Sequence, residues 1–206
     1  MASNERPKLA GLTGLRVAVT AGAGGIGLCI ARTLAEQGAR LAVCDVDEEA
    51  LDTARAESGI EVAEVADVSE DAQIARFFER IAARMGGLDA MVNNAGIAGP
   101  TGGVEQIAPA DWRRCLDVCL TGQFLCTHHA VPMLKAAGGG AIVNISSAAG
   151  RFGYAYRTSY ASAKWGVIGF TQSLAKELGP DNIRVNAILP GIIEGPRMEG
   201  VIDARA

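Results

Sequence analysis

The stretch Thr20–Gly27, TAGAGGIG, links a short apolar run to a segment with helical spacing. Leu15–Thr20 (LRVAVT) before it has the composition of a buried strand, and Gly25–Gln37 after it has the pattern of an amphipathic helix. Glycines at a strand-to-helix turn let the backbone approach a phosphate group, and the helix N-terminus supplies N–H donors and positive potential. A tight turn that only needs positive φ is the alternative explanation.

A carboxylate follows at the spacing that a dinucleotide site requires. The run Arg40–Asp45 is predicted to be the second strand, and it ends at Asp45, 18 residues after Gly27. A carboxylate at this point can accept hydrogen bonds from an adenosine ribose, whereas it would repel a 2′-phosphate. No arginine follows Asp45 closely. We therefore expect dinucleotide binding, with NAD(H) favoured over NADP(H).

The same alternation of strand and helix patterns continues along the chain. It predicts βαβ units, and hence an α/β fold of the Rossmann type, with a doubly wound parallel sheet and helices on both faces. We expect a single domain over residues 1–206, with 10–100 mainly the cofactor half and 101–206 the catalytic half and the start of a substrate loop. The further predicted strands are Ile60–Val68, Leu88–Asn94, Gly140–Ser146 and Ile183–Leu189, and the further predicted helices are Glu70–Met85, Asp111–Lys135 and Ser159–Leu178.

Composition narrows the classes of partner. A chain of 206 residues with 49% hydrophobic residues supports one sizeable core. The net charge of −4 and the lack of a basic cluster argue against nucleic acid as the main partner. No apolar run approaches the roughly 20 residues that cross a bilayer, and the N-terminal segment lacks the apolar region of a secretory signal. We expect a cytoplasmic protein that binds no membrane.

The cysteines predict neither disulfides nor a metal site. The five cysteines are odd in number and form no CxxC pair. Cys115, Cys119, His128 and His129 fall within one predicted helix, where the two adjacent histidines diverge by about 100°. Buried thiols and partly exposed imidazoles explain these residues better than a metal centre does.

The stretch Ser159–Gly166, SYASAKWG, contains a tyrosine and a lysine four residues apart. On a helix, Tyr160 and Lys164 lie on the same face, and taken alone such a pair is usually packing with a solvated ammonium group. The alternative is an acid/base pair of an enzyme, because a nearby cation stabilises a phenolate. The context of the pair decides between the two.

Six motifs, in order along nearly the whole chain, resemble those of the short-chain dehydrogenase/reductase family. The turn at Thr20–Gly27 is similar to the family's TGxxxGIG, and Ser147 precedes Tyr160 by 13 residues, which is the family's spacing. This resemblance favours the catalytic interpretation of the tyrosine–lysine pair. The other matching stretches are Asp67-Val68, Asn93–Gly96 (NNAG), Asn144–Ser147 (NISS), Tyr160–Lys164 (YASAK) and Pro190-Gly191.

The resemblance implies an NAD-dependent alcohol dehydrogenase or ketone reductase. Tyr160 would exchange the proton, Lys164 would stabilise the phenolate and bind the nicotinamide ribose, and Ser147 would polarise the substrate oxygen. The substrate would be a small secondary alcohol or carbonyl compound, of hydroxyacyl, sugar-like or cyclic type. The expected cofactor-binding residues are Gly22, Gly25, Ile26, Gly27, Asp45, Asp67, Val68, Asn94, Tyr160, Lys164, Pro190 and Ile193.

Simpler explanations exist for several of these residues. Asp67 can cap a strand end, Asn94 can form a turn and Ile193 can belong to the core. A different class of function is also open, namely a catalytically impaired NAD(H)-binding regulatory protein of the same fold. The resemblance further implies a homotetramer or homodimer, formed through the two long helices Asp111–Lys135 and Ser159–Leu178.

The sequence departs from the family pattern at four points. Ala21 stands where a glycine is usual, Cys119 replaces the asparagine that is thought to hold a proton-relaying water, and Gly195 replaces a threonine. A thiol is a weak donor and acceptor and would hold such a water poorly. The chain also stops before the family's substrate-covering helix and seventh strand, so we expect the C-terminal part of the fold, and much of the substrate pocket, to be absent.

Overall fold

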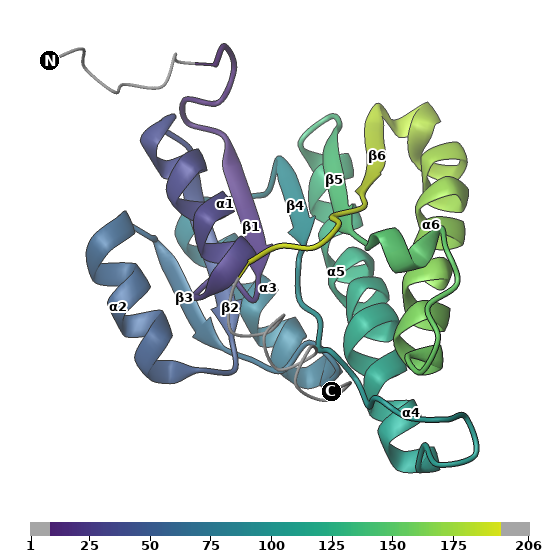
Figure 1. Cartoon of the computed structure of the whole chain (residues 1–206). Coiled ribbons are helices and arrows are strands. Elements are labelled where there is room, and N and C mark those ends of the chain that lie inside the picture. The colour runs from purple at the N-terminus through teal and green to yellow at the C-terminus, as the bar shows by residue number, and fades with distance from the viewer. Residues whose placement is uncertain (1–8, 195–206) are drawn as a thin grey trace, which may run out of the picture.

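Six parallel strands form one sheet, in the order β3-β2-β1-β4-β5-β6 (Figure 1). The structure is a computed structural model that describes residues 9–194, apart from the side chain of Glu57. The expected doubly wound α/β fold is confirmed. The strands are β1 (Arg16–Thr20), β2 (Arg40–Asp45), β3 (Val62–Val65), β4 (Ala90–Asn93), β5 (Gly140–Ile145) and β6 (Ile183–Ile188).

The order of the strands reverses between β1 and β4, which pair in parallel with Val17 opposite Ala90. The chain leaves β1 toward one side of the sheet and later returns to β4 on the other side. At such a switch point the connections after two neighbouring strands diverge, and a crevice opens at their carboxyl ends. The fold therefore provides a ligand site at the ends of β1 and β4.

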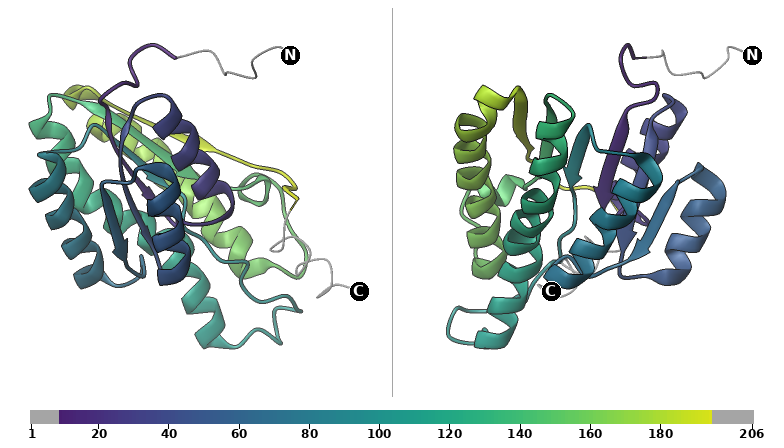
Figure 2. Two further views of the ribbon diagram at one scale, coloured as in Figure 1. Left: turned by 90° about the vertical axis from the view of Figure 1, so that its left-hand side faces the viewer. Right: turned by 180° about the vertical axis from the view of Figure 1, so that it is seen from behind.

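Helices cover both faces of the sheet (Figure 2). On one face lie α1 (Gly25–Glu36) and α2 (Glu48–Ser58); on the other lie α3 (Asp71–Met85), α5 (Gly122–Ala136) and α6 (Thr158–Leu178). Strand residues alternate between the two cores: Val17 and Val19 pack toward α1 and α2, whereas Ala18 packs toward the other layer. Because both faces are buried, β1 is apolar at every interior position rather than alternating with polar residues.

The helix α2 was missing from the sequence-based prediction. Its segment EEALDTARAES is largely polar, and only Leu51 and Ala54 reach the core. Its ends nevertheless carry recognisable signals: the Asp47 carboxylate caps the helix by accepting from Ala50 N, and Gly59 ends it with a φ of 62°. Capping residues identify this helix where hydrophobic spacing does not.

Two predicted boundaries were wrong. The strand expected over Ile60–Val68 is only Val62–Val65, because Asp67 already begins a turn in which its carboxylate accepts from Ser69 N. The single helix expected over Asp111–Lys135 begins at Pro109 and consists of α4 (Pro109–Leu116), a π-helical segment η1 (Asp117–Thr121) and α5. Such π-helical insertions often mark functional sites.

Within residues 9–194, no helix has both the length and the apolar character needed to cross a membrane.

Candidate active site

A cavity of about 960 Å³ lies at the carboxyl ends of the central strands. Its walls come from the glycine turn, the end of β2, the segments after β4 and β5, the start of α6 and the segment after β6. This last segment, drawn in yellow, runs from β6 across the front of β4 toward α1 (Figure 1). The volume suits a small-molecule or cofactor site. The predicted site residues in the wall are Gly25, Ile26, Asp45, Asn94, Ser147, Tyr160, Lys164, Pro190 and Ile193.

The glycine turn presents bare backbone to this cavity. A Cβ atom added at Gly24 or Gly25 would meet no atom within 4 Å, so the space beside them is open to a ligand. Gly27 has the opposite role: a Cβ there would lie 2.0 Å from the Ala21 carbonyl oxygen, so only glycine lets α1 start this close to the turn. The N-cap residue of α1, Gly24, provides no side-chain acceptor for the first N–H groups of the helix. This arrangement suits a phosphate group.

The side chain of Asn94 holds the turn in place. Its Nδ2 donates to the carbonyl oxygens of Thr20 and Ala21, both at 3.0 Å, and its backbone N–H donates to Thr20 Oγ1 at 3.0 Å. Ala21 has a φ of 48°, a left-handed conformation that costs a non-glycine residue about 1–2 kcal/mol. Asn94 therefore fixes a strained turn, and the structure gives it this supporting role at the edge of the cavity.

Asp45 ends β2 beside the turn, where the sequence spacing predicted it. Its Oδ2 accepts from Ala23 N at 3.1 Å, and its Oδ1 accepts from Val46 N at 2.8 Å. These backbone donors orient the carboxylate, which lies in the cavity wall. Gly22 lies behind the turn, where an added Cβ would be 2.7 Å from the Val43 side chain, so it contributes to packing rather than to the wall.

The structure brings Tyr160, Lys164 and Ser147 together around one cavity. The Lys164 side chain is buried, and its Nζ donates to Ile145 O at 2.8 Å, at the end of β5. The same Nζ lies 5.8 Å from the centroid of the Tyr160 ring. Ser147 follows β5, where its Oγ accepts from Ala149 N at 3.2 Å. A phenol, an ammonium group and a hydroxyl therefore share one partly buried site.

Close packing between η2 (Ala148–Gly150) and α6 sets the position of this group. A Cβ on Gly150 would lie 2.6 Å from the backbone oxygen of Lys164, and the Ser146 hydroxyl donates to that same oxygen at 2.8 Å. These contacts join α6 to the end of β5 at Lys164. They therefore fix the position from which the lysine side chain extends to the cavity. The predicted catalytic helix is thus anchored directly to the sheet.

Cys119 occupies a buried position in η1, beside the loop that follows β4. Its Sγ accepts from Ile97 N at 3.4 Å and is 3.5 Å from Ile97 O, to which it can donate. An added Cβ on Gly96 would lie 3.6 Å from this sulfur and 3.4 Å from Lys164 Nζ. The thiol at the family's asparagine position therefore ties the loop to η1, close to the lysine.

The thiols and imidazoles do not form a metal site. A hydrogen bond with Cys119 and burial raise the pKa of the Cys115 thiol, so this side chain stays protonated at neutral pH. His129 instead pairs with Asp71, with Nε2 and Oδ1 2.9 Å apart, and stacks on Phe78. Across residues 9–194, no three His, Cys, Asp or Glu side chains gather in a way that could hold an ion.

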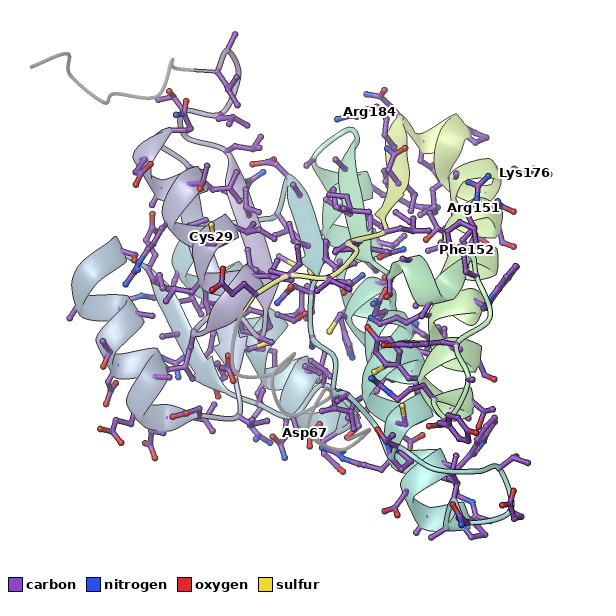
Figure 3. The ribbon with its side chains drawn as sticks, in the orientation of Figure 1. Cys29, Asp67, Arg151, Phe152, Lys176 and Arg184 are labelled. Carbon is purple, nitrogen blue, oxygen red and sulfur yellow. The ribbon has the colours of Figure 1, made fainter. Side chains whose placement is uncertain are left out.

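Four predicted cofactor residues are not part of the cavity wall: Gly22 and Gly27, described above, and Asp67 and Val68. Although burial acts in the opposite direction, hydrogen bonds from Arg114 and Ser69 hold the pKa of Asp67 below its ordinary value. The Val68 side chain packs against Gly122 in the core. Figure 3 shows Asp67 at the lower edge of the molecule, away from Phe152 beside α6. The predicted contacts of Asp67 and Val68 with adenine remain predictions, and Gly195 lies outside the described residues.

The cavity also includes residues that the motifs did not indicate. Phe152, Tyr154 and Arg157 line it, together with Ile192 and Glu194. Arg157 directly precedes α6, outside the helix expected over Ser159–Leu178, so helical spacing did not indicate it. Phe152 and Ile192 lie in irregular segments where no spacing rule applies. The exposed Cys29 on α1 borders the cavity as well (Figure 3).

Comparison with known proteins gives consistent matches. A family model described as short chain dehydrogenase matches residues 16–205. The cis-4-hydroxycyclohexanecarboxylate dehydrogenase of Sinomonas cyclohexanicum is 44% identical over 196 residues, which span 93% of this chain and 79% of that protein. The cyclohexanol dehydrogenase of Acinetobacter sp. (strain SE19) is 39% identical, with 88% of this chain and 74% of that protein covered.

Solved structures agree with these matches. The crystal structure of levodione reductase superposes with a TM-score of 0.90 at 34% identity, covering 94% of this chain and 77% of that one. The structure of NAD+-bound xylitol dehydrogenase gives a TM-score of 0.91 at 32% identity, with 95% and 77% covered. The expectation of an oxidoreductase that acts on CH–OH groups is confirmed. The chain belongs to the short-chain dehydrogenase/reductase family.

Proposed function

We propose that this protein is an NAD-dependent dehydrogenase that oxidises a small cyclic secondary alcohol, or reduces the corresponding ketone. One observation carries the proposal: Tyr160, Lys164 and Ser147 line the same cavity as the glycine turn and Asp45. The acid/base groups and the proposed dinucleotide-binding residues therefore line one cavity. Such a combination is what hydride transfer to or from a carbinol carbon requires, because a proton must leave or join the oxygen at the same time.

The residues present fit a dinucleotide. Open space beside Gly24 and Gly25 and the uncapped start of α1 suit its pyrophosphate, and the Asp45 carboxylate suits the adenosine ribose. When bound, NAD+ supplies the hydride acceptor. The segment Pro190–Glu194 forms part of the same wall, which suits contacts with the nicotinamide end.

The protein's own groups handle the proton and the oxygen. In our proposal the Ser147 hydroxyl donates a hydrogen bond to the substrate oxygen, and Tyr160 exchanges a proton with that oxygen. The ammonium group of Lys164, held near the ring by Ile145 O, favours the phenolate form of Tyr160. General acid/base assistance of this kind contributes about 10²–10⁴-fold to a rate.

The substrate proposal rests on relatives and on the outer wall of the cavity. Relatives whose names specify cyclohexanol and hydroxycyclohexanecarboxylate match this chain at 39% and 44% identity. Phe152, Tyr154, Ile192 and Ile193 supply apolar surface to the cavity, which suits an alicyclic ring better than a polyhydroxylated sugar. A cyclic alcohol is therefore preferred among the three substrate types expected from the sequence.

We further propose NAD(H) rather than NADP(H) as the cofactor. The Asp45 carboxylate is held by Ala23 N and Val46 N at the cavity wall, where a 2′-phosphate would meet a second negative charge. We also propose a cytoplasmic location. All five cysteines are free thiols, and proteins whose cysteines stay unpaired are typical of reducing compartments.

Assembly into a homodimer or homotetramer through α4, α5 and α6 is part of the same proposal. Phe124 on α5 and Trp165 on α6 are 49% and 51% exposed, and Trp112, Leu116 and Leu120 line an open groove along α4 and η1. Large exposed apolar groups of this kind favour association.

Light scattering at micromolar concentration should give a dimer or tetramer mass. A monomer mass under these conditions would show that the proposed assembly is wrong.

Activity is tested with NAD+ and a panel containing cyclohexanol, cis-4-hydroxycyclohexanecarboxylate and xylitol. We expect nicotinamide reduction with at least one cyclic alcohol, and a loss of at least about 100-fold in kcat for Tyr160→Phe, because the phenylalanine ring cannot exchange a proton. Tyr156→Phe, which changes an exposed tyrosine outside the cavity wall, is the matched control and should leave kcat unchanged.

The competing function, a catalytically impaired NAD(H)-binding protein, predicts a different result in that experiment. Its motivation is Cys119, which replaces the family's asparagine near Lys164, together with Gly195, which replaces the family's threonine. It would be supported by tight NADH binding in a fluorescence titration with no turnover of any alcohol or ketone. Equal turnover by wild type and Tyr160→Phe would instead contradict the proton-exchange role of Tyr160.

Cofactor choice is tested at Asp45. In wild type, NADH should bind at least about tenfold more tightly than NADPH, because the carboxylate repels the added phosphate. The variant Asp45→Ala should lose much of this preference, whereas Asp47→Ala, at an exposed carboxylate two residues away, should keep it. Dissociation constants from fluorescence titration measure both. Tighter binding of NADPH than NADH by wild type would overturn the assignment.

A further inference from the structure

Arg157 is a buried cation in the wall of the active-site cavity. Its side chain is largely covered, with the residue only 3% exposed, and it immediately precedes α6. The guanidinium Nη2 donates to Ala98 O at 2.6 Å, which joins the start of α6 to the loop that follows β4. Burying a charged side chain costs free energy, so the position of Arg157 beside the proposed acid/base group indicates a specific role.

The guanidinium lies against the rings of two tyrosines. Its Cζ atom is 4.8 Å from the centroid of the Tyr160 ring and 5.4 Å from that of Tyr154. Both distances fall within the range of about 6 Å in which a cation is attracted to an aromatic face. The guanidinium of Arg157 is thus closer to the Tyr160 ring than the ammonium group of Lys164 is, because Lys164 Nζ lies 5.8 Å from the ring centroid.

We propose that Arg157 is a positioning residue for Tyr160: it fixes the ring by stacking and favours the negatively charged form of the phenol during alcohol oxidation. This inference rests on the proposed function. The stack and the bond to Ala98 O restrain the ring between α6 and the loop after β4, so the phenol oxygen keeps one orientation toward the cavity. The guanidinium also adds a second positive charge beside the one that Lys164 supplies.

Arginine suits this task better than lysine. Its guanidinium is planar, remains charged over the whole working pH range and stacks on aromatic rings, whereas an ammonium group is a compact and strongly hydrated charge. In a partly buried site, one unit charge a few ångströms from another moves a titration by about one pH unit or more. The negative charge that Tyr160 carries once it has lost its proton is the one that Arg157 stabilises.

The other groups around Tyr160 give it one more cation and several neutral neighbours. Lys164 is the second cation on α6, and Ser147, after β5, is neutral. Tyr160 also packs against the buried cluster formed by Cys115 on α4, Cys119 on η1 and Ala163 on α6. A hydrogen bond with Cys119 and burial raise the pKa of Cys115, so this thiol remains neutral through the working range.

The carboxylates of the cavity come from other segments. Asp45 belongs to the end of β2, and Glu194 lies on the segment after β6. Removing Arg157 therefore takes one positive charge from the surroundings of Tyr160 and leaves these carboxyl groups in place.

The pH dependence of kcat/KM for cyclohexanol oxidation with NAD+ tests the proposal. Cyclohexanol is uncharged, so the profile is insensitive to any direct contact between Arg157 and a substrate carboxylate. In wild type, kcat/KM should rise with pH as Tyr160 becomes able to accept a proton. For Arg157→Met and Arg157→Gln, the rising limb should move up by about one pH unit, and kcat at neutral pH should fall about tenfold or more.

Two further variants separate charge from structure. Arg157→Lys retains the charge, so its rising limb should stay within about 0.3 pH unit of wild type, although kcat falls with the loss of stacking. Arg151→Met removes an exposed cation beside Phe152 (Figure 3), outside the cavity wall, and should leave both kcat and the profile unchanged.

Each alternative outcome is decisive. A uniform loss of activity with an unshifted pH profile in Arg157→Met would overturn the proposal. Loss of folding or of NADH binding in both Arg157→Met and Arg157→Gln would also overturn it, because Arg157 would then contribute to stability only. A higher KM for cis-4-hydroxycyclohexanecarboxylate with no effect on cyclohexanol would make Arg157 a substrate anchor instead. An inactive wild type would refute the proposed function, whereas an active one with an unchanged variant profile refutes only this inference.

Discussion

The hydrogen bonds between Asn94 and the end of β1 are the constraint on which the site depends. One carboxamide donates to the carbonyl oxygens of Thr20 and Ala21, and the Thr20 hydroxyl accepts the backbone N–H groups of Asn94 and Ala95. These bonds hold the carboxyl ends of β1 and β4 together at the point where the strand order reverses. They also hold Ala21 in a left-handed conformation, so that α1 can start beside the turn. The shape of the proposed cofactor site thus depends on a contact between Thr20 and Asn94, which are 74 positions apart in the sequence.

The acid/base group depends on a second, similar junction at the end of β5. Lys164 Nζ donates to Ile145 O, and the Ser146 hydroxyl donates to Lys164 O. The helix α6, which carries the proposed acid/base pair, is therefore joined to the sheet through both the side chain and the backbone of Lys164. Arg157 makes the corresponding bond to the loop after β4. Since β4 and β5 are neighbours in the sheet, the register of these two strands places the proposed cofactor site and the proposed acid/base group relative to each other.

Much of this was predictable from sequence because the decisive residues sit at strand ends. Asp45 ends a recognisable strand and Asn94 and Ser147 follow two others, and parallel strands bring their carboxyl ends to one edge. The helix α2 escaped detection because its buried face is only Leu51 and Ala54. The π-helical segment around Cys119 and the stacking of Arg157 arise from tertiary contacts with Ile97 and Tyr160, which hydrophobic spacing does not encode. Sequence motifs therefore indicated which residues meet, but not which neighbours support them.

Hydride transfer from substrate to cofactor is the central claim, and isotopic labelling tests it most directly. The protein is incubated with NAD+ and cyclohexanol that carries deuterium at its carbinol carbon, and the NADH formed is analysed by mass spectrometry. If the cavity functions as proposed, each cyclohexanone formed is matched by one NADH that carries one deuterium. Unlabelled NADH, or no reduction of NAD+ by any cyclic alcohol although the dinucleotide binds, would contradict it.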